Sequence, residues 1–136
     1  MDFELIEHAL PILLLGAGVT IEITAVSVAI GFFIGLFVGI ARISQMKILR
    51  ILATIYADCI RGTPLLVQIF LIYFALPIVT GHRVEPFAAA VIACGINSGA
   101  YVSEIFRAGI QSIDIGQTEA GRSLGLTWWQ TMYYVI

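Results

Sequence analysis

Charged residues are scarce in this chain. Asp, Glu, Lys and Arg together make up 12% of its 136 residues, whereas about a quarter is usual for a soluble protein. Hydrophobic residues reach 60%, and a soluble domain of this length could not bury so much apolar surface. The sequence therefore predicts a membrane protein whose apolar side chains face lipid. Lys47 is the single lysine and no basic run exists, so a nucleic-acid partner is excluded.

Cysteine and catalytic motifs are equally sparse. Cys59 and Cys94 lie in apolar segments without C-x-x-C spacing, which predicts two small buried hydrophobes rather than a metal or redox site. The zinc-protease, nucleophile-elbow and phosphate-loop patterns are all missing. We therefore predict no catalytic residue, no metal and no ATP hydrolysis in this chain. The N-terminus lacks a basic region and the first apolar run is long, so we expect no cleavable signal.

Three apolar segments can each cross a bilayer, at about residues 11–40, 51–79 and 87–110. About 20 helical residues span the hydrocarbon core, so the fold class predicted is an all-α membrane protein. Pro64 interrupts the second segment, and because proline lacks an N–H we expect a kink or break there. Aromatic residues after position 127 indicate a return to the membrane interface and the start of a fourth span.

Small residues recur at every fourth position of the first span, at Ser27, Gly31, Gly35 and Gly39. This spacing places them on one helical face. A face of small residues lets a second helix approach closely. We therefore predict that another span packs against this face.

The basic residues predict the topology. One side of the three spans carries most of them, and the other carries Arg83 and an acidic N-terminus. Because cytoplasmic loops are enriched in Lys and Arg, the N-terminus is expected outside and the 111–127 loop in the cytoplasm. The residues on the cytoplasmic side are Arg42, Lys47, Arg50, Arg107 and Arg122.

Polar residues inside a span are costly and need a reason. Asn97, Tyr101 and Glu104 share one helical face, which Gln111 continues. This stripe either lines a translocation path or holds the helices together by hydrogen bonds, and spacing alone leaves both readings open. Asp58 and Arg61 are three residues apart, which predicts a structural ion pair near the membrane boundary.

Three stretches together resemble the permease subunit of polar amino-acid ABC importers of the glutamine, histidine and arginine type. They are residues 61–68 (RGTPLLVQ), 97–110 (NSGAYVSEIFRAGI) and 117–126 (QTEAGRSLGL). The three stretches occur in the same order, and between apolar segments of the same arrangement, as in these permeases. The resemblance therefore extends from about residue 10 onward. The structural motif of the first stretch comprises Arg61, Gly62, Thr63 and Pro64.

The third stretch resembles the cytoplasmic EAA signature of these permeases, E-A-A-x3-G-x9-I-x-L-P. Glu119, Ala120 and Gly125 fit it, Gly121 replaces the second alanine, and Val135 takes the isoleucine position. The sequence ends just before the expected Leu-Pro, so the resemblance implies further C-terminal spans. It also implies a MetI-like helical bundle across residues 1–136, with three spans and the start of a fourth.

The resemblance implies a mechanism and partners. The EAA loop would form a short helix that docks on a separate ATP-binding subunit, which would bind the ATP and Mg. That subunit would drive a permease dimer, formed with a second copy or a sister permease, between inward-facing and outward-facing states. An extracytoplasmic binding protein would deliver the amino acid. The location implied is the bacterial cytoplasmic (inner) membrane.

Roles for single residues follow from the resemblance. Glu119 would contribute a charge for docking and for the N-terminal end of its helix. Gly125 would allow a tight bend after that helix. The 97–111 stripe becomes a predicted path lining. The residues assigned to the path or its packing are Gln68, Asn97, Tyr101 and Glu104, and those assigned to coupling are Glu119, Ala120, Gly121 and Gly125.

Two other functions are compatible with several apolar spans. An ion-coupled secondary transporter could use the broken segment at Gly62-Thr63-Pro64 as a midplane site, although no inverted repeat is evident in three spans. A non-transporting membrane assembly subunit is the other alternative. Dependence of uptake on ATP rather than on an ion gradient separates the first of these from an ABC importer.

Overall fold

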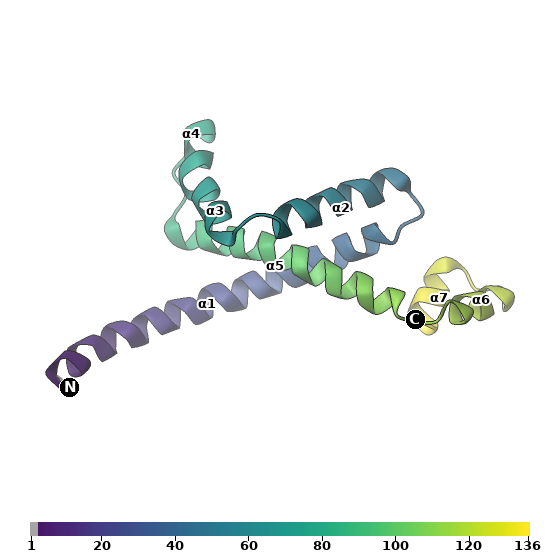
Figure 1. The fold of residues 1–136 in the computed structure, drawn as a ribbon, viewed down its shortest axis with the longest axis horizontal. Helices are drawn as coiled ribbons and strands as arrows, with labels where there is room; N and C mark the ends of the chain where they lie inside the picture. Colours follow the sequence, from purple (N-terminus) through teal and green to yellow (C-terminus); the bar gives the residue numbers. More distant parts are fainter. Residues whose placement is uncertain (1–2) are drawn as a thin grey trace.

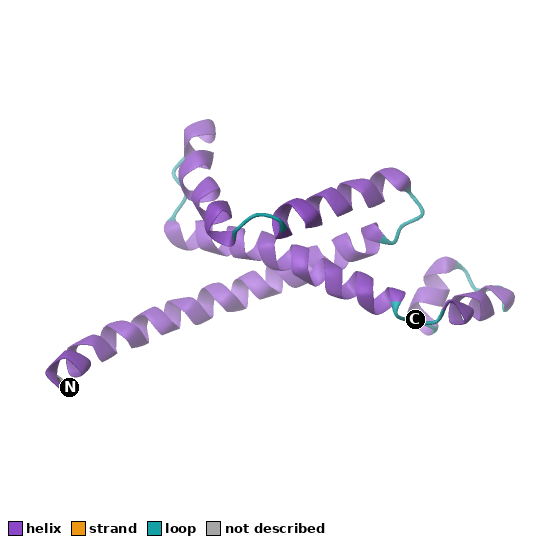
Figure 2. Cartoon of the chain, viewed as in Figure 1, coloured by secondary structure: helices purple, strands orange, loops and turns teal. Residues whose placement is uncertain are grey.

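The computed structural model describes residues 3–136, with side chains from residue 9 onward. Asp2 and the side chains of Glu4 and Glu7, which contribute to the acidic N-terminus, lie outside this part. All regular elements of the described residues are helical (Figures 1 and 2). In chain order they are α1 (Phe3–Arg42), α2 (Lys47–Arg61), α3 (Leu65–Phe70), the π-helix η1 (Leu71–Ala75), α4 (Leu76–Thr80), α5 (Pro86–Gln111), α6 (Ile115–Ser123) and α7 (Trp128–Tyr134).

Two of the helices, α1 and α5, are long and apolar enough to cross a membrane. They cover the first and third expected spans, and α1 extends beyond residues 11–40 at both ends. The second expected span is divided, because α2 and the α3–α4 segment meet at an angle of 102°. They form a third span only if the bent pair crosses as one unit.

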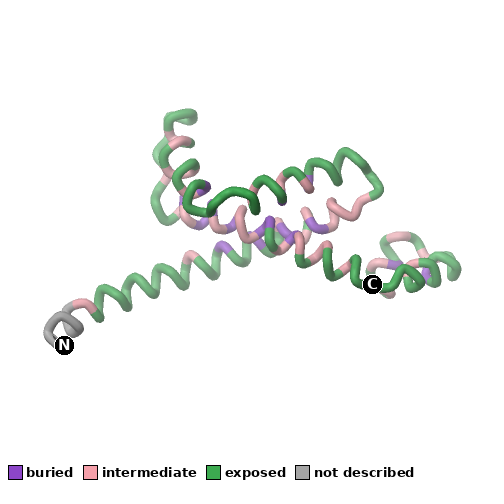
Figure 3. Tube along the Cα trace, in the orientation of Figure 1, coloured by how far each residue is buried: buried purple, intermediate pink, exposed green. Residues whose placement is uncertain are grey.

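The α1–α5 crossing is the densest part of the fold. Figure 3 shows buried residues gathered where these helices cross, while residues 10–22 of α1 are exposed. A Cβ added to Gly31 would lie 2.5 Å from Ser98 Oγ, and one added to Gly35 would lie 2.5 Å from Val102 Cγ1. Neither position has room for a methyl group. The predicted packing face of α1 is confirmed, and its partner is α5.

The same crossing interlocks in the other direction. Side chains of α1 fill the space above the glycines of α5, so that a Cβ on Gly99 would lie 2.7 Å from Ile34 Cγ2. Ser27, at the N-terminal end of the small-residue face, is 2% exposed and donates a hydrogen bond to the Val91 carbonyl at 3.3 Å. The two helices therefore approach at backbone distance over several turns.

The expected break at Pro64 is confirmed. α2 ends at Arg61, and Pro64 is extended, with φ −60° and ψ 136°, before α3 begins. The break removes helical donors from the carbonyls of the last turn of α2. Two side chains replace them: Thr63 Oγ1 donates to the Cys59 carbonyl at 3.1 Å, and Gln68 Nε2 donates to the Ile60 carbonyl at 2.8 Å. Gln68 Nε2 also donates to the Thr63 carbonyl within the break at 3.1 Å. Backbone groups at an interrupted span are satisfied in this way by a side chain.

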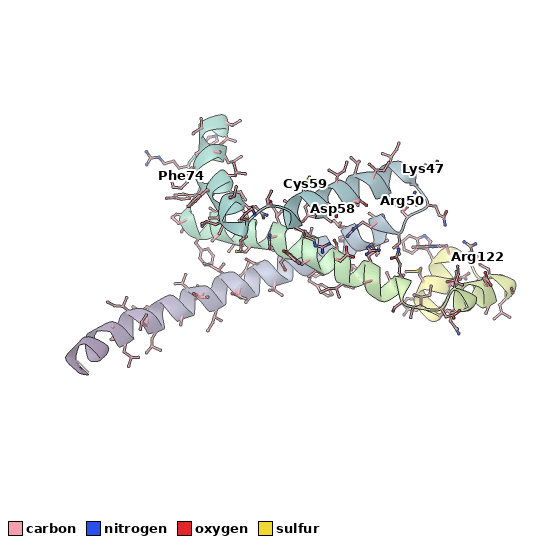
Figure 4. All side chains as sticks on the ribbon, in the orientation of Figure 1. Lys47, Arg50, Asp58, Cys59, Phe74 and Arg122 are labelled. Carbon is pink, nitrogen blue, oxygen red and sulfur yellow. The ribbon has the colours of Figure 1, made fainter. Side chains whose placement is uncertain are left out.

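The prediction that both cysteines are buried is wrong for Cys59, which is exposed on α2, whereas Cys94 is half-buried on α5. Figure 4 shows Cys59 near the end of α2, on the helix that covers only part of α5. An apolar neighbourhood in a membrane protein therefore does not imply burial against protein, because lipid can take that place.

Candidate functional site

Two of the predicted path residues meet at the break between α2 and α3. Asn97 Nδ2 on α5 donates to Gln68 Oε1 at 3.3 Å. The Gln68 amide is 8% exposed and is fully engaged, because its nitrogen holds the carbonyls of the break and its oxygen accepts from Asn97. Gln68 and Asn97 together therefore fix the bent segment against α5.

Tyr101 lies one turn further along the same face of α5. It is 50% exposed, and the Arg61 guanidinium carbon lies 5.6 Å from the centre of its ring. This distance and geometry are those of a cation–π contact. Of the predicted path residues, Tyr101 presents the largest open polar side chain, between the Gln68–Asn97 pair and the charges that follow.

Glu104 is surrounded by arginines from three helices, a group named here the arginine cluster. Arg42 of α1 donates to Oε2 at 2.6 Å, and Arg61 of α2 donates to the same oxygen at 3.1 Å. Arg107, one turn further on α5, donates to Oε1. The Glu104 side chain is 25% exposed and that of Arg42 is 8% exposed. One carboxylate thus ties α1, α2 and α5 together through charge-assisted hydrogen bonds.

The predicted ion pair between Asp58 and Arg61 is wrong. Arg61 extends to Glu104 on α5, and Asp58 lies 3.9 Å from Arg42 on α1. Arg61 ends α2 where that helix lies beside α5, so it reaches the less exposed carboxylate across the helix boundary. The spacing of charged residues in the sequence can predict ion pairs only within one helix, whereas these pairs join different helices. The surplus of arginines over acids near the ends of the spans was the signal that could have identified the cluster.

The second candidate site is the α6–α7 unit beyond α5. Asp114 caps α6, since its Oδ1 accepts from the Gly116 N–H at 2.7 Å. Glu119 is in the middle of this helix and exposed. The expectation that Glu119 stabilises the helix N-terminus is therefore wrong, because Asp114 holds that position. The charge of Glu119 remains open to solvent or to a partner.

Gly125 ends the unit's first helix as expected. Its φ is +78°, in the left-handed region that favours glycine. Its N–H donates to the Arg122 carbonyl at 2.9 Å, and the Leu126 N–H donates to the Gly121 carbonyl at 3.1 Å. This is the hydrogen-bonded C-terminal bend expected after a short helix, and it turns the chain into α7.

Gly121, the departure from the signature, faces α7. It is buried, and an added Cβ would lie 3.0 Å from Thr131 Cγ2 and 3.1 Å from Thr131 Oγ1. Thr131 is 2% exposed, and α7 is fixed at its start by a capping box between Thr127 and Gln130. Glu119 and Ala120 are exposed on α6. The missing methyl group therefore belongs to the contact between α6 and α7.

Membrane-length helices around a broken segment, followed by a short capped helix and a glycine bend, define an α-helical membrane protein. Residues 27–136 match the family described as "Binding-protein-dependent transport system inner membrane component". The chain belongs to this family. The predicted fold class, an all-α membrane protein of the MetI-like type, is confirmed.

Similar proteins agree with this assignment. The chain is 45% identical to the glutamine transport system permease protein GlnP of Escherichia coli K12, over 99% of this chain and 62% of that one. It is 40% identical to the arginine transport system permease protein ArtQ of Bacillus subtilis, over 97% and 60%. A crystal structure of an amino acid ABC transporter with histidines matches with a TM-score of 0.89 and 44% identity, over 100% of this chain and 63% of that one. The chain thus spans less than two thirds of these relatives.

Proposed function

We propose that this chain is the membrane permease subunit of an ATP-driven importer of polar amino acids. The α6–Gly125–α7 unit carries the proposal. It presents Glu119 and Ala120 outward while Gly121 packs inward on Thr131, which is an arrangement suited to docking on another subunit. The names of the similar proteins, a glutamine permease, an arginine permease and an amino acid ABC transporter, support amino acids as the substrate class.

The proposed partners follow from the same unit. A separate ATP-binding subunit would bind ATP and Mg and receive α6, so that this chain is not itself an enzyme. A second copy or a sister permease would complete the pathway, and an extracytoplasmic binding protein would supply the amino acid. The family's description as an inner membrane component supports a bacterial cytoplasmic membrane location, and the distribution of basic residues supports an N-terminus outside.

The proposed path runs along the α5 face that carries Asn97, Tyr101 and Glu104. The half-exposed Tyr101 ring, with Arg61 beside it, is the part best placed to meet a polar solute. Gln68 and Glu104 contribute by holding the path's walls, because their polar atoms are already bonded to the break and to the arginine cluster.

The test is Glu119→Gln, with Glu85→Gln as the matched control. Both side chains are exposed carboxylates, and Glu85 lies at the opposite end of α5 from α6. In proteoliposomes holding the assembled transporter, Glu119→Gln is expected to lower ATP-dependent amino-acid uptake at least about tenfold, the effect of losing about 1.4 kcal/mol of docking energy. Glu85→Gln should leave uptake unchanged. Full uptake by the Glu119→Gln transporter would contradict the docking role.

The energy source separates the alternatives. Uptake that stops with an ionophore and ignores ATP would indicate a secondary transporter. Absence of substrate-stimulated ATP hydrolysis in the complete complex would indicate an assembly subunit. The importer requires uptake that follows ATP and persists when ion gradients are collapsed.

A further inference from the structure

A pocket of about 350 Å³ lies between the ends of α1, α2 and α5. Each of these helices contributes one arginine to its lining, namely Arg42, Arg50 and Arg107. The Thr54 hydroxyl and the Gln111 amide belong to the same lining. A volume of this size falls within the range of small-molecule sites, about 300–1,000 Å³. Guanidinium groups, a hydroxyl and an amide together suit an anion with several acceptor oxygens.

The charge around the pocket is not balanced by the described part of the protein. Arg42, Arg61 and Arg107 share the carboxylates of Glu104 and Asp58. Arg50 forms no ion pair with any side chain that the structure describes. Counting Arg61, Glu104 and Asp58, which lie next to the lining but outside it, four arginines accompany two carboxylates, an excess of two positive charges.

One donor in this lining is also without a partner. Arg42 Nε is buried and has no hydrogen-bond acceptor among the described residues, and the Arg42 side chain is 8% exposed. A buried guanidinium donor left unpaired costs free energy that an acceptor oxygen would recover. The Nε atom itself is covered by protein, so it is the positive charge excess of the lining that favours an anionic occupant.

The pocket's position indicates which anion it receives. It lies at the C-terminal ends of the two membrane-length helices, α1 and α5. Ile51 and Ile55 form an apolar part of its wall. Figure 4 shows Arg50 near the start of α2, close to the loop after α1, with Lys47 beyond it. Apolar walls next to guanidinium groups at a helix end match the boundary between acyl chains and headgroups, where basic pockets bind lipid phosphates.

We infer that this pocket binds the phosphate headgroup of an anionic phospholipid of the cytoplasmic leaflet, such as phosphatidylglycerol. The arginines and Thr54 hold the phosphate, and the isoleucines contact the start of the acyl chains. The single negative charge of the bound phosphate offsets half of the charge excess between α1, α2 and α5. This role is separate from transport, and only the choice of the cytoplasmic leaflet rests on the membrane orientation proposed above.

Arg50→Gln is the informative variant, because Arg50 lines the pocket without belonging to the arginine cluster. Lys47→Gln is its matched control, since it removes the same charge one turn earlier in α2 from a residue outside the lining. Native mass spectrometry of the detergent-purified chain, titrated with phosphatidylglycerol, measures the apparent Kd. Arg50→Gln is expected to raise it about tenfold, the effect of one charge-assisted contact, while Lys47→Gln changes it less than about twofold.

Three further measurements distinguish a bound phospholipid from a free phosphate or a protein carboxylate. Phosphatidylcholine should bind more weakly to the parent chain and show no difference between the variants. Inorganic phosphate and glycerol 3-phosphate should fail to displace phosphatidylglycerol, and displacement would indicate a free-phosphate site. The assembled transporter should retain the lipid, and its loss on assembly would show that a protein carboxylate fills the pocket.

Equal Kd values for the parent and the Arg50→Gln chain would overturn the proposal, as would an equal loss in Lys47→Gln. Circular dichroism of each variant checks that the helices remain intact. Arg50 is exposed on its helix, so unfolding is not expected to obscure the result.

Discussion

α5 is held on two of its faces by different kinds of interaction. Towards α1, apart from the Ser27 hydrogen bond and the Arg42–Glu104 ion pair, the contact is between small residues, with glycine backbones close to the side chains of the opposite helix. Towards α2 and α3 it consists of an amide pair, a cation–π contact and the arginine cluster. The first face depends on shape, and the second on hydrogen bonds and charge.

The difference indicates which parts of the domain can rearrange. A close-packed face has no alternative partners at equal distance, so α1 and α5 should move as one unit. Polar side chains can replace a hydrogen bond within the protein by one to a solute or to water, provided that each donor and acceptor keeps a partner. The α2–α3 side, which includes the break at residues 62–64, is therefore the side expected to change during transport.

The largest effect on this comparison is expected from Glu104→Gln. The change leaves the guanidinium groups of Arg42, Arg61 and Arg107 without their shared carboxylate. Breaking a fully buried ion pair costs about 3–5 kcal/mol, and partial exposure of Glu104 reduces the expected loss to about 2–3 kcal/mol. Denaturant titration in detergent, followed by circular dichroism, measures it.

Glu85→Gln serves as the control for that variant, because Glu85 is an exposed carboxylate before α5 and forms no ion pair among the described side chains. Its stability should stay within about 0.5 kcal/mol of the parent chain. If the two variants were equally stable, the arginine cluster would not hold the polar face together.

A smaller but more local effect is expected from Gly35→Ala on the shape-dependent face. The added methyl group would overlap Val102, so overpacking should cost about 1–3 kcal/mol. Gly18→Ala lies on the same helix with nothing within 4 Å of the added Cβ, and it should be neutral or slightly stabilising. The same titration compares them, and a neutral Gly35→Ala would show that α1 and α5 do not pack this closely.

The features that could be predicted from sequence are those whose signals are local, on the shape-dependent face and at the chain's bends. The four-residue spacing identified the packing face of α1, Pro64 identified the break, and Gly125 identified the bend after α6. In each case the residue type restricts the backbone, or the approach to it, without reference to the rest of the fold.

The charged half could not be predicted to the same extent because its pairs join different helices. Arg42 and Glu104 are 62 residues apart in the sequence. Spacing of one helical turn instead predicted an ion pair between Asp58 and Arg61. The role of Gly121 was also hidden, since Thr131, which fills its space, belongs to the next helix. Similarly, the position of Glu119 depended on Asp114 beginning α6, which moved the carboxylate to mid-helix.

The central claim is that α6 docks on an ATP-binding subunit through its exposed face, with its other face closed by α7. Cysteine crosslinking in the assembled transporter tests it most directly, in a background with Cys59 and Cys94 replaced by serine. Ala120→Cys, on the exposed face, should crosslink to the ATP-binding subunit, whereas Thr131→Cys, at a position 2% exposed, should not. Crosslinking from position 131 with none from position 120 would contradict the account.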